Sequence, residues 1–393
     1  MPHPIAPDVV CLRCATELRD PFAPCPACAD DGVAVNGVTR YADPPDARRG
    51  PNLPVALPPT EPTPLEPLPR AGAAIGATSL LLKDETGPPT WSYKDRLARV
   101  AVAHAQSVGA EVVTASSSGN HGAAIASAAS RAGLPSVIFT VASIAPPMRA
   151  AIEGAGGVLV PFDLAEDRWT VMRAAVREAG WYPASNFHDP PIGSNPYGID
   201  GYKEIAWEIV RTLGDAPDWV VVPVGYGDGI AGIVRGFAEA QAAGLAGRTP
   251  AAMAAVTSDA LPDALARGAD QAVTHSVLAP QALSITGGFA TYQALDAVRS
   301  TGGAARTVDD AAALAARTLV GRLEGRLLEL SSAAALAATA AAIADGTIEP
   351  GQRVVVVGTS SGLKDPLASL DAEPPAAVPG TLEATLAHVA AQR

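Results

Sequence analysis

The sequence lacks both an excess of basic residues and a long apolar run, and each absence excludes a class of function. Its 28 Lys and Arg residues face 40 Asp and Glu residues, which gives a formal net charge of −12. Nucleic-acid and anionic-membrane surfaces need clustered positive charge, so we expect neither as a partner. The most apolar stretch, residues 331–346, is mainly alanine and too short to span a bilayer. With no leader-like segment after Met1, these features predict a soluble, cytoplasmic protein.

Cysteine is also scarce, and its few positions form a pattern. The chain has four, Cys11, Cys14, Cys25 and Cys28, in the arrangement C-x2-C-x10-C-x2-C. Two CxxC pairs can present four thiolates to a tetrahedral zinc ion. The alternative is a pair of disulfides, which the cytosol disfavours. Four sulfur ligands would leave no open coordination position, so the predicted zinc would be structural.

Length and composition predict more than one packed domain. The chain has 393 residues, of which 48% are hydrophobic and 17% charged, and this composition is typical of a globular protein. The proline-rich stretch has ten prolines between Pro44 and Pro69, so we expect it to be extended rather than helical. The predicted parts are a zinc-ribbon-like segment over 1–40, a proline-rich crossing segment over 41–72, a large domain over 73–105 and 205–370, a small domain over 106–204, and a C-terminal tail over 371–393.

Short Val/Ile-rich runs alternate with alanine-rich amphipathic stretches from residue 79 onward. Such alternation predicts an α/β fold with parallel sheets buried on both faces by helices. Ligands of these folds bind beyond the carboxyl ends of the strands, so the loops there are the first candidates for a site. The predicted strands are 79–85, 110–117, 135–141, 156–162, 218–224, 253–259 and 353–359.

A glycine-rich loop follows the strand at 218–224. In "VGYGDGI", Gly225, Gly227 and Gly229 would allow backbone N–H groups to converge on one phosphate at the start of a helix. A purely structural turn is an equally common explanation of such a loop. Because a carboxylate repels phosphate, we expect the Asp228 side chain to turn away and cap a helix that begins near Ile230.

Two further loops carry hydroxyl and amide groups. "SSSGNHG" (116–122) has more donors than a helix cap needs, which favours a site, although capping remains the alternative. "GTSSG" (358–362) follows a buried strand, and its three hydroxyl residues either cap a helix or face a ligand ring. Lys94, in "PTWSYKDRL" (89–97), lies at the predicted start of a helix and is the candidate nucleophile. A lysine, a single-phosphate loop and two donor loops are the parts of a pyridoxal phosphate site.

On these residues, the chain resembles the threonine synthase branch of the fold type II, tryptophan-synthase-β-like, pyridoxal-phosphate-dependent enzymes. The resemblance covers roughly residues 55–370 and implies a two-domain fold plus the N-terminal cysteine ribbon. The matching motifs occur in the family's order: "TPL" (63–65), "KDE" (83–85), "PTWSYKDR" (89–96), "SSGNHG" (117–122), "NPYGIDGYK" (195–203), the loop 225–229, "ELSSAA" (329–334) and "TSSGLKDP" (359–366).

The resemblance implies roles for these residues. Lys94 would bind the cofactor covalently and then move the substrate's α-proton, and Asn120 would donate to the cofactor's phenolic oxygen. The substrate carboxylate would be bound by Ser117, Ser118, Gly119 and His121, although a lone histidine more often packs or caps. The phosphate would be bound by the backbone of Gly225, Tyr226, Gly227, Asp228 and Gly229. Thr359 would face the pyridine nitrogen, and Glu329 would line the pocket. The family also implies a homodimer.

Three departures from the family pattern concern substrate choice. Trp91 stands where the family has glycine, and Tyr226 where it has asparagine. Threonine synthases resemble N-S-x-N-P-x-R-x-E-G where this chain has "IGSNPYGIDG" (192–201), so Gly198 replaces the arginine that pairs with the substrate phosphate. Losing such a partner costs about 2–5 kcal/mol, which makes O-phosphohomoserine doubtful as the substrate. Ser194 or Lys203 would be the candidates to compensate.

The sequence therefore predicts a threonine-synthase-like lyase that eliminates or replaces a group on an amino acid, with altered substrate choice. The alternatives are a threonine or serine ammonia-lyase and a β-replacement enzyme acting on a phosphoserine-like substrate. A cofactor-binding regulatory protein without activity is a non-enzymatic alternative. The ribbon as a nucleic-acid contact is disfavoured, because it carries only Arg13 and Arg19 among several acids before residue 40.

Overall fold

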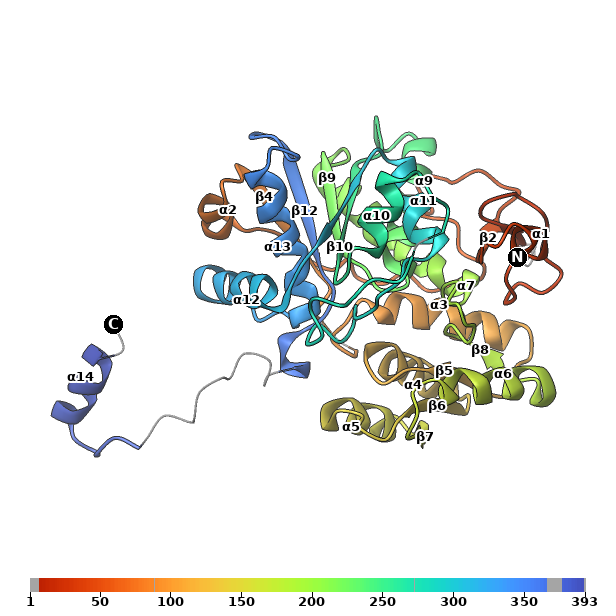
Figure 1. Ribbon diagram of the computed structural model, residues 1–393, viewed down its shortest axis with the longest axis horizontal. Coiled ribbons are helices and arrows are strands. Elements are labelled where there is room, and N and C mark those ends of the chain that lie inside the picture. Colours follow the sequence, from red (N-terminus) through yellow and green to blue (C-terminus); the bar gives the residue numbers. More distant parts are fainter. Residues whose placement is uncertain (1–6, 88, 272, 366–376, 392–393) are drawn as a thin grey trace.

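A computed structural model describes residues 7–87, 89–271, 273–365 and 377–391. Two sheets and a small ribbon make up the molecule (Figure 1). The larger sheet has the strand order β11-β10-β9-β12-β4-β3 and is parallel except for β3, which pairs antiparallel with β4. Its strands are β3 (Leu65–Pro67), β4 (Ser79–Asp84), β9 (Trp219–Pro223), β10 (Ala251–Val256), β11 (Ala304–Thr307) and β12 (Arg353–Gly358).

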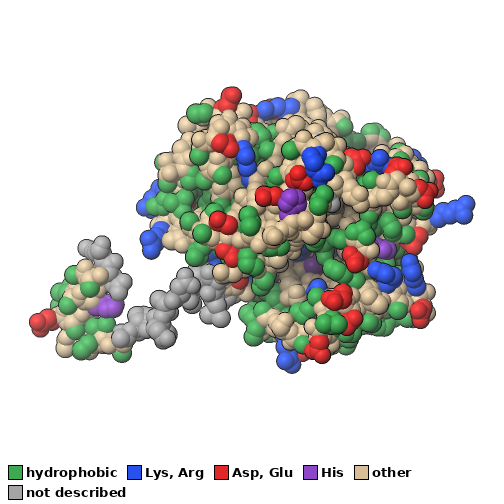
Figure 2. Space-filling model, in the orientation of Figure 1, with side chains coloured by type: hydrophobic (Ala, Val, Ile, Leu, Met, Phe, Trp, Pro, Cys, Tyr) green, Lys and Arg blue, Asp and Glu red, His purple; other side chains and the backbone are tan. Residues whose placement is uncertain are grey.

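The smaller sheet has the order β7-β6-β5-β8, and all of its strands are parallel. Its strands are β5 (Val113–Ser116), β6 (Ser136–Val141), β7 (Val158–Phe162) and β8 (Tyr182–Pro183), and the helices packed on them include α4 (Asn120–Ala132), α5 (Pro146–Gly154) and α6 (Asp167–Ala179). In the space-filling view, a hollow separates the lobe of the larger sheet from that of the smaller one (Figure 2).

Helices cover the larger sheet because its central strands are apolar on both faces. In β9 and β12, Val220, Val221, Val354 and Val355 are all fully buried. The remaining helices are α2 (Pro69–Ile75), α3 (Lys94–Ser107), α7 (Pro196–Ile199), η1 (Asp200–Tyr202), α8 (Lys203–Leu213), α9 (Asp228–Ala242), α10 (Ala260–Ala266), α11 (Tyr292–Ser300), α12 (Asp310–Glu324), α13 (Leu330–Ala344), η2 (Gly362–Lys364) and α14 (Leu382–Ala391). None of the helices in the described part of the chain is long and apolar enough to cross a bilayer.

The N-terminal ribbon is an antiparallel pair, β1 (Asp8–Cys11) and β2 (Gly37–Arg40), with the short helix α1 (Pro26–Asp30) between them. It has its own small core, which includes Val9, Leu18 and Val35. The ribbon packs against the rest of the chain near α7 and α11 (Figure 1), because Tyr197 and Tyr292 contact this core.

All seven strands predicted from the sequence are confirmed, and the α/β class with them. Three further strands in the two main sheets, β3, β8 and β11, were not predicted, because they are two to four residues long and lack Val/Ile runs. The prediction that residues 41–72 contain no helix is wrong at its end. Pro69 is the first residue of α2, a position where a missing N–H costs no hydrogen bond. Within the predicted tail 371–393, residues 371–376 and 392–393 lie outside the described residues, and α14 buries no side chain.

Candidate active site

Residues 91–93 pair with residues 359–361, which brings two of the predicted loops together. Ser92 forms an antiparallel bridge with Ser360, and the Tyr93 N–H donates to the Thr359 carbonyl at 2.8 Å. The Ser361 N–H donates in turn to the Trp91 carbonyl at 3.0 Å. Helix α3 begins immediately after this pairing, at Lys94. The lysine is therefore held at the carboxyl end of β12, where a parallel sheet binds its ligands.

Lys94 and Lys364 are the two lysines for which no ion pair is found in the described part of the chain, and of these two Lys364 donates to the Asn120 side-chain oxygen at 2.6 Å. The chain contains only four lysines, Lys83, Lys94, Lys203 and Lys364. Lys83 pairs with Glu208 at 2.5 Å and Lys203 with Glu239 at 2.6 Å, both in the interior. Among the described residues, Lys94 forms no ion pair.

Aromatic rings surround the Lys94 ammonium instead. Its Nζ lies 4.9 Å from the centroid of the Tyr93 ring and 5.7 Å from that of Tyr202. Both rings lie within the range of a cation–π attraction to the amine, and Lys94 is half-buried beside them. The Tyr202 hydroxyl is buried and has no hydrogen-bond partner in the described part of the chain. Burial raises the pKa of both phenols, so they stay protonated at neutral pH.

The start of α3 is anchored by a buried ionic cluster two residues beyond Lys94. The Arg96 guanidinium contacts Glu85 at 2.9 Å and Glu208 at 2.5 Å. Glu208 also accepts from Lys83 and from the Thr63 backbone, which attaches the proline-rich segment to the same cluster. Paired and hydrogen-bonded charges of this kind tolerate burial, whereas a single unpaired one does not. The carboxylates of Glu85 and Glu208 are thus neutralised by Arg96 and Lys83.

The glycine loop ends in the N-terminus of α9. Gly227 caps this helix in a left-handed conformation with φ +82°, and no side chain caps it. In the described part of the chain, no acceptor is found for the N–H groups of Gly225, Gly227 and Gly229. A Cβ built on Gly229 would lie 2.6 Å from the Tyr93 ring, so only glycine allows this close approach. Free N–H groups at a helix N-terminus suit the cofactor's phosphate.

Asp228 turns away from the loop, as predicted, but the prediction that it caps a helix beginning near Ile230 is wrong. The helix begins two residues earlier, at Asp228 itself. The Asp228 carboxylate accepts instead from the Ser194 N–H and hydroxyl, at 2.8 and 2.6 Å, and from the Gln293 amide at 2.7 Å. These three donors neutralise much of the charge that would repel a phosphate.

Tyr226 is fixed on both sides. Its ring stacks on Phe289 with centroids 5.3 Å apart, and its carbonyl accepts from Thr291 at 2.7 Å and from Gln293 at 2.6 Å. Burial raises the pKa of its phenol to about 12, so it is neutral in this setting. Since the carbonyl is held outward, the loop's amide groups are left for a ligand.

The serine-rich loop leads directly into α4. Gly119 precedes this helix and no side chain caps it, so plain capping does not explain the loop. Ser117 accepts from the Gly119 N–H at 3.2 Å, which orders the turn. The His121 Nε2 lies 3.1 Å from the Ala184 carbonyl, and burial and the nearby Lys94 charge lower the pKa of His121 to about 4. His121 is therefore neutral at pH 7. Ser117, Ser118, Gly119 and His121 all remain partly exposed around this helix start.

Asn120 is the centre of a polar network. Its amide donates to Glu329 at 2.7 Å and to Ser284 at 3.1 Å, and its carbonyl oxygen accepts from Lys364 at 2.6 Å. Burial lowers the pKa of Lys364, while Glu329 and Asp95 oppose that shift. Sequence reasoning gave no role to Lys364 or Ser284. Lys364 lies in the quoted motif "GLKDP", which could have drawn attention to it, whereas Ser284 lies in a stretch without any motif.

The hydroxyl groups of loop 358–362 make two kinds of contact: some join neighbouring loops, and one caps a helix. Thr359 is buried, and its hydroxyl lies 2.8 Å from that of Ser332. Ser361 accepts from the Leu363 N–H and so caps η2, which is the capping alternative considered from the sequence. Ser360 donates to the Trp91 carbonyl at 3.2 Å. Thr359 thus offers a neutral hydroxyl rather than a carboxylate. If it faced the cofactor's pyridine nitrogen, it would polarise that nitrogen only weakly.

The segment 192–201 is not arranged to bind a phosphate. Gly198 is buried in α7 against α3, and a Cβ there would already lie 3.0 Å from both Ala101 and Leu97. An arginine at this position would require the Leu97 and Ala101 side chains to shift by a few tenths of an ångström. Ser194 is bonded to Asp228, and Lys203 is fully buried in ion pairs, so neither group is free to compensate.

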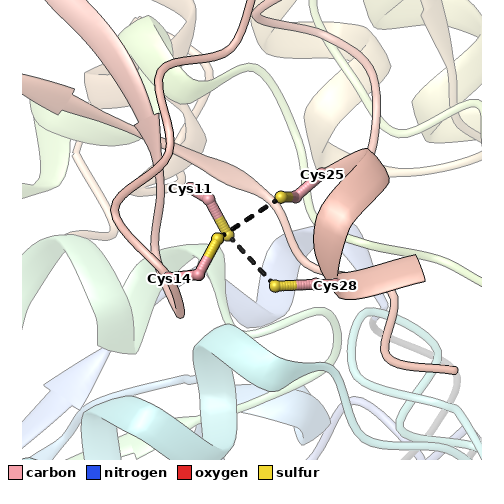
Figure 3. Close-up of side chains that lie close together, drawn as sticks. All are labelled: Cys11, Cys14, Cys25 and Cys28. Carbon is pink, nitrogen blue, oxygen red and sulfur yellow. Dashed lines mark hydrogen bonds between the residues drawn. The ribbon is translucent and has the colours of Figure 1, made fainter. Parts of the chain in front are cut away.

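The four cysteine sulfurs converge in the ribbon (Figure 3). Cys11 lies 3.6 Å from Cys28 and Cys14 lies 3.6 Å from Cys25, and all four sulfurs lie within 4.8 Å of one another. All four are free cysteines, so the disulfide alternative is not realised. The separations are those of a tetrahedral site with metal–sulfur distances of about 2.3 Å. Arg13 pairs with Asp31 and Asp270, which ties the ribbon to the body of the protein.

Comparison with known proteins agrees with this geometry. Residues 56–360 match the family described as "Pyridoxal-phosphate dependent enzyme". The chain belongs to this family. Among curated relatives, threonine synthase of Methanocaldococcus jannaschii is 30% identical over 306 residues, which is 76% of this chain and 74% of that protein. Threonine synthase of Methanosarcina acetivorans is 31% identical over 332 residues, covering 82% and 80%. The predicted resemblance to the threonine synthase branch is confirmed.

Solved structures confirm the predicted fold type II architecture. Maize serine racemase superposes with a TM-score of 0.65 at 23% identity, covering 84% of this chain and 94% of that one. Diaminopropionate ammonia lyase of Escherichia coli gives a TM-score of 0.67 at 17% identity, covering 80% and 89%. At these identities the likeness concerns the fold alone.

Trp91 has a left-handed backbone conformation, which glycine adopts more readily than other residues. Its φ is +56°, and its side chain is 51% exposed. A residue with a Cβ pays about 1–2 kcal/mol for a left-handed conformation. We expect Trp91→Gly to be more stable than Trp91→Ala by about 1 kcal/mol, because both lose the indole but only glycine loses the strain. Urea unfolding of the two variants measures this difference. An alanine variant as stable as the glycine variant would contradict the assigned backbone conformation.

Because His121 is neutral in the folded protein, we expect the free energy of unfolding to fall in acid. The unfolded histidine titrates near pH 6.5 and the folded one near 4, so the unfolded chain binds more protons between these values. The free energy of unfolding therefore falls as the pH drops from 6.5 toward 4, by roughly 2 kcal/mol at pH 5. His121→Gln should lose this part of the pH dependence in urea unfolding at pH 7 and pH 5. An unchanged difference between the two pH values would show that His121 is not the group responsible.

Proposed function

We propose that this protein is a pyridoxal 5′-phosphate-dependent lyase that acts on an amino acid by elimination or replacement, with Lys94 as its reactive amine. The observation that carries the proposal is the placement of Lys94. Within the described residues it is the lysine with neither an ion pair nor a hydrogen-bond acceptor, and Tyr93 links it to both the glycine loop and Thr359. A non-catalytic binding protein would not need an amine kept free in this way.

The chemical groups of these residues match those of the cofactor. The N–H groups of Gly225, Gly227 and Gly229 would hold its phosphate, with support from the dipole of α9. Tyr226 and Asp228 belong to the same cradle through their backbone. Thr359 would face the ring nitrogen. Asn120 would donate to the phenolic oxygen, for which its amide must exchange one of its two present acceptors.

The residues of the chain would have separate roles in binding the substrate and moving its proton. The bound cofactor would supply an electron sink for charge developing at the substrate's α-carbon. Ser117, Ser118, Gly119 and the neutral His121 would bind the substrate carboxylate at the N-terminus of α4, where the helix dipole favours an anion. The Lys94 amine would take the α-proton and return it, and the rings of Tyr93 and Tyr202 lie beside that amine.

We propose that the substrate carries no distal phosphate. Gly198 leaves no cation at the family's arginine position, and Ser194 and Lys203 are engaged elsewhere. An ammonia-lyase on threonine or serine is the second candidate, since its substrates need only the carboxylate and amino sites. A β-replacement reaction on a phosphoserine-like substrate would need a phosphate contact outside segment 192–201. A homodimer and a cytoplasmic location are further predictions, which come from the family resemblance and the composition.

Lys94→Ala tests the assignment of the amine. The cofactor-loaded wild type should absorb visible light, and Lys94→Ala should lose that absorption and at least about three orders of magnitude in turnover. Lys364→Ala is the matched control, because it removes a second lysine at the site but should keep the visible absorption. A colourless wild type in excess cofactor, or a coloured and active Lys94→Ala, would refute the proposal.

In the same assay, O-phosphohomoserine should react about two to four decades less efficiently than the best unphosphorylated substrate.

We also propose that the four cysteines bind one structural zinc ion. The purified protein should contain about one zinc per chain, and Cys25→Ser should lose it, because three thiolates bind far more weakly than four. The ribbon core would then loosen, so limited proteolysis should cut within residues 7–40 faster in Cys25→Ser than in wild type. Metal analysis gives the direct measurement. Wild-type protein without zinc after purification in zinc-containing medium would contradict the site.

A further inference from the structure

The ribbon contacts the glycine loop through side chains that are not metal ligands. Asn36, which precedes β2, is 2% exposed, although it lies on a small appended segment. Its backbone is fixed by the first cysteine turn, because the Leu12 N–H donates to the Asn36 carbonyl at 3.2 Å. The Gly37 N–H donates to its side-chain oxygen at 3.0 Å. The Asn36 amide nitrogen is thereby directed out of the ribbon and into the body of the protein.

A closed ring of hydrogen bonds continues from this amide to the loop. The Asn36 Nδ2 donates to the Ser194 carbonyl at 3.0 Å and to the Gln293 Oε1 at 3.3 Å. The Gln293 Nε2 donates to the Tyr226 carbonyl at 2.6 Å and to the Asp228 carboxylate at 2.7 Å. Ser194 completes the ring by donating twice to Asp228. The four side-chain residues of the ring are at most 4% exposed, so these bonds do not compete with bulk water.

The backbone of the neighbouring segment is shaped around this ring. Gly193 has φ +130°, and a Cβ there would lie 2.4 Å from the Gln293 amide and 2.7 Å from that of Asn36. A serine at this position, as in the threonine synthase pattern that segment 192–201 resembles, would displace both amides. The exchange of that side chain for glycine therefore makes room for Asn36 and Gln293. Segment 192–201 serves in this chain as a docking surface for the ribbon.

We propose that Asn36 and Gln293 are positioning residues for the cofactor-phosphate loop, so that the ribbon sets the protein's affinity for its cofactor. The inference rests on the proposed function, in which loop 225–229 holds that phosphate. Gln293 holds the Tyr226 carbonyl outward and neutralises Asp228, and Asn36 fixes the rotamer of Gln293 by donating to its oxygen. Without Asn36 the Gln293 amide can rotate, which leaves Thr291 as the donor to the Tyr226 carbonyl and Ser194 as the donor to the Asp228 carboxylate. Each group is then less firmly held away from the phosphate. Both groups repel an anion.

The test compares variants that each remove one ribbon contact. Asn36→Asp keeps the shape but loses the donor and adds a charge, and Asn36→Ala removes the contact. Thr39→Val is the matched control: Thr39 also lies in the ribbon and donates to buried Asp200 at 2.6 Å, but in the described part of the chain no hydrogen bond or ion pair joins Asp200 to loop 225–229. Apoprotein of each variant is titrated with pyridoxal 5′-phosphate, and the dissociation constant is read from visible absorption. Thermal unfolding of the apoproteins and kcat at saturating cofactor are measured in parallel.

We expect Asn36→Ala to weaken cofactor binding by roughly five- to tenfold, the usual worth of one buried hydrogen bond, and Asn36→Asp to weaken it more. Thr39→Val should stay within about twofold of wild type, and kcat at saturation should change little in all three. Cofactor affinity unchanged in both Asn36 variants would overturn the inference while leaving the proposed function intact. Equal weakening in Thr39→Val would also overturn it, because a general loss of ribbon docking would then explain the effect. A wild type that binds no cofactor would refute the proposed function and the inference with it.

Discussion

The site depends on keeping one ammonium group free of carboxylates inside an acidic protein. Glu85 and Glu208 are held by Arg96, two residues beyond Lys94, and Asp228 is held by hydrogen-bond donors. A buried carboxylate left without such partners would attract the lysine, and an ion-paired amine is a poor nucleophile and a poor base. The ion pairs and hydrogen bonds around the first turns of α3 and α9 therefore keep these carboxylates from pairing with Lys94.

The same constraint links parts of the chain that are distant in sequence. The pairing of 91–93 with 359–361 places Lys94 beside Thr359, and the contact of Tyr93 with Gly229 places both beside the glycine loop. Asp228, whose charge must be kept from that loop, is bonded to segment 192–201 and α11, and through them to the ribbon. The departures from the threonine synthase pattern then form one group. Glycine at 193 and 198 allows close packing with Gln293, Asn36 and α3.

Much of this arrangement could be predicted from the sequence, because parallel strands and phosphate-binding loops have local signatures. The seven Val/Ile-rich strands and the convergence of the cysteines depend on residues close together in the chain. The network of Asn120 with Ser284 and Lys364 could not be predicted, since it joins residues more than 160 positions apart. The partners of Asp228 were missed for the same reason. The left-handed backbone of Trp91 was missed because the pairing with 359–361, and not its own side chain, imposes it.

The most direct test of the account is to fix the cofactor to its lysine and find which one carries it. Borohydride reduction of the cofactor-loaded protein, followed by proteolysis and mass spectrometry, locates the added group among four lysines. Lys83 and Lys203 are buried in ion pairs, so the choice lies between Lys94 and Lys364. The account predicts the group on Lys94 alone. Its appearance on Lys364, or on no lysine, would contradict the central claim.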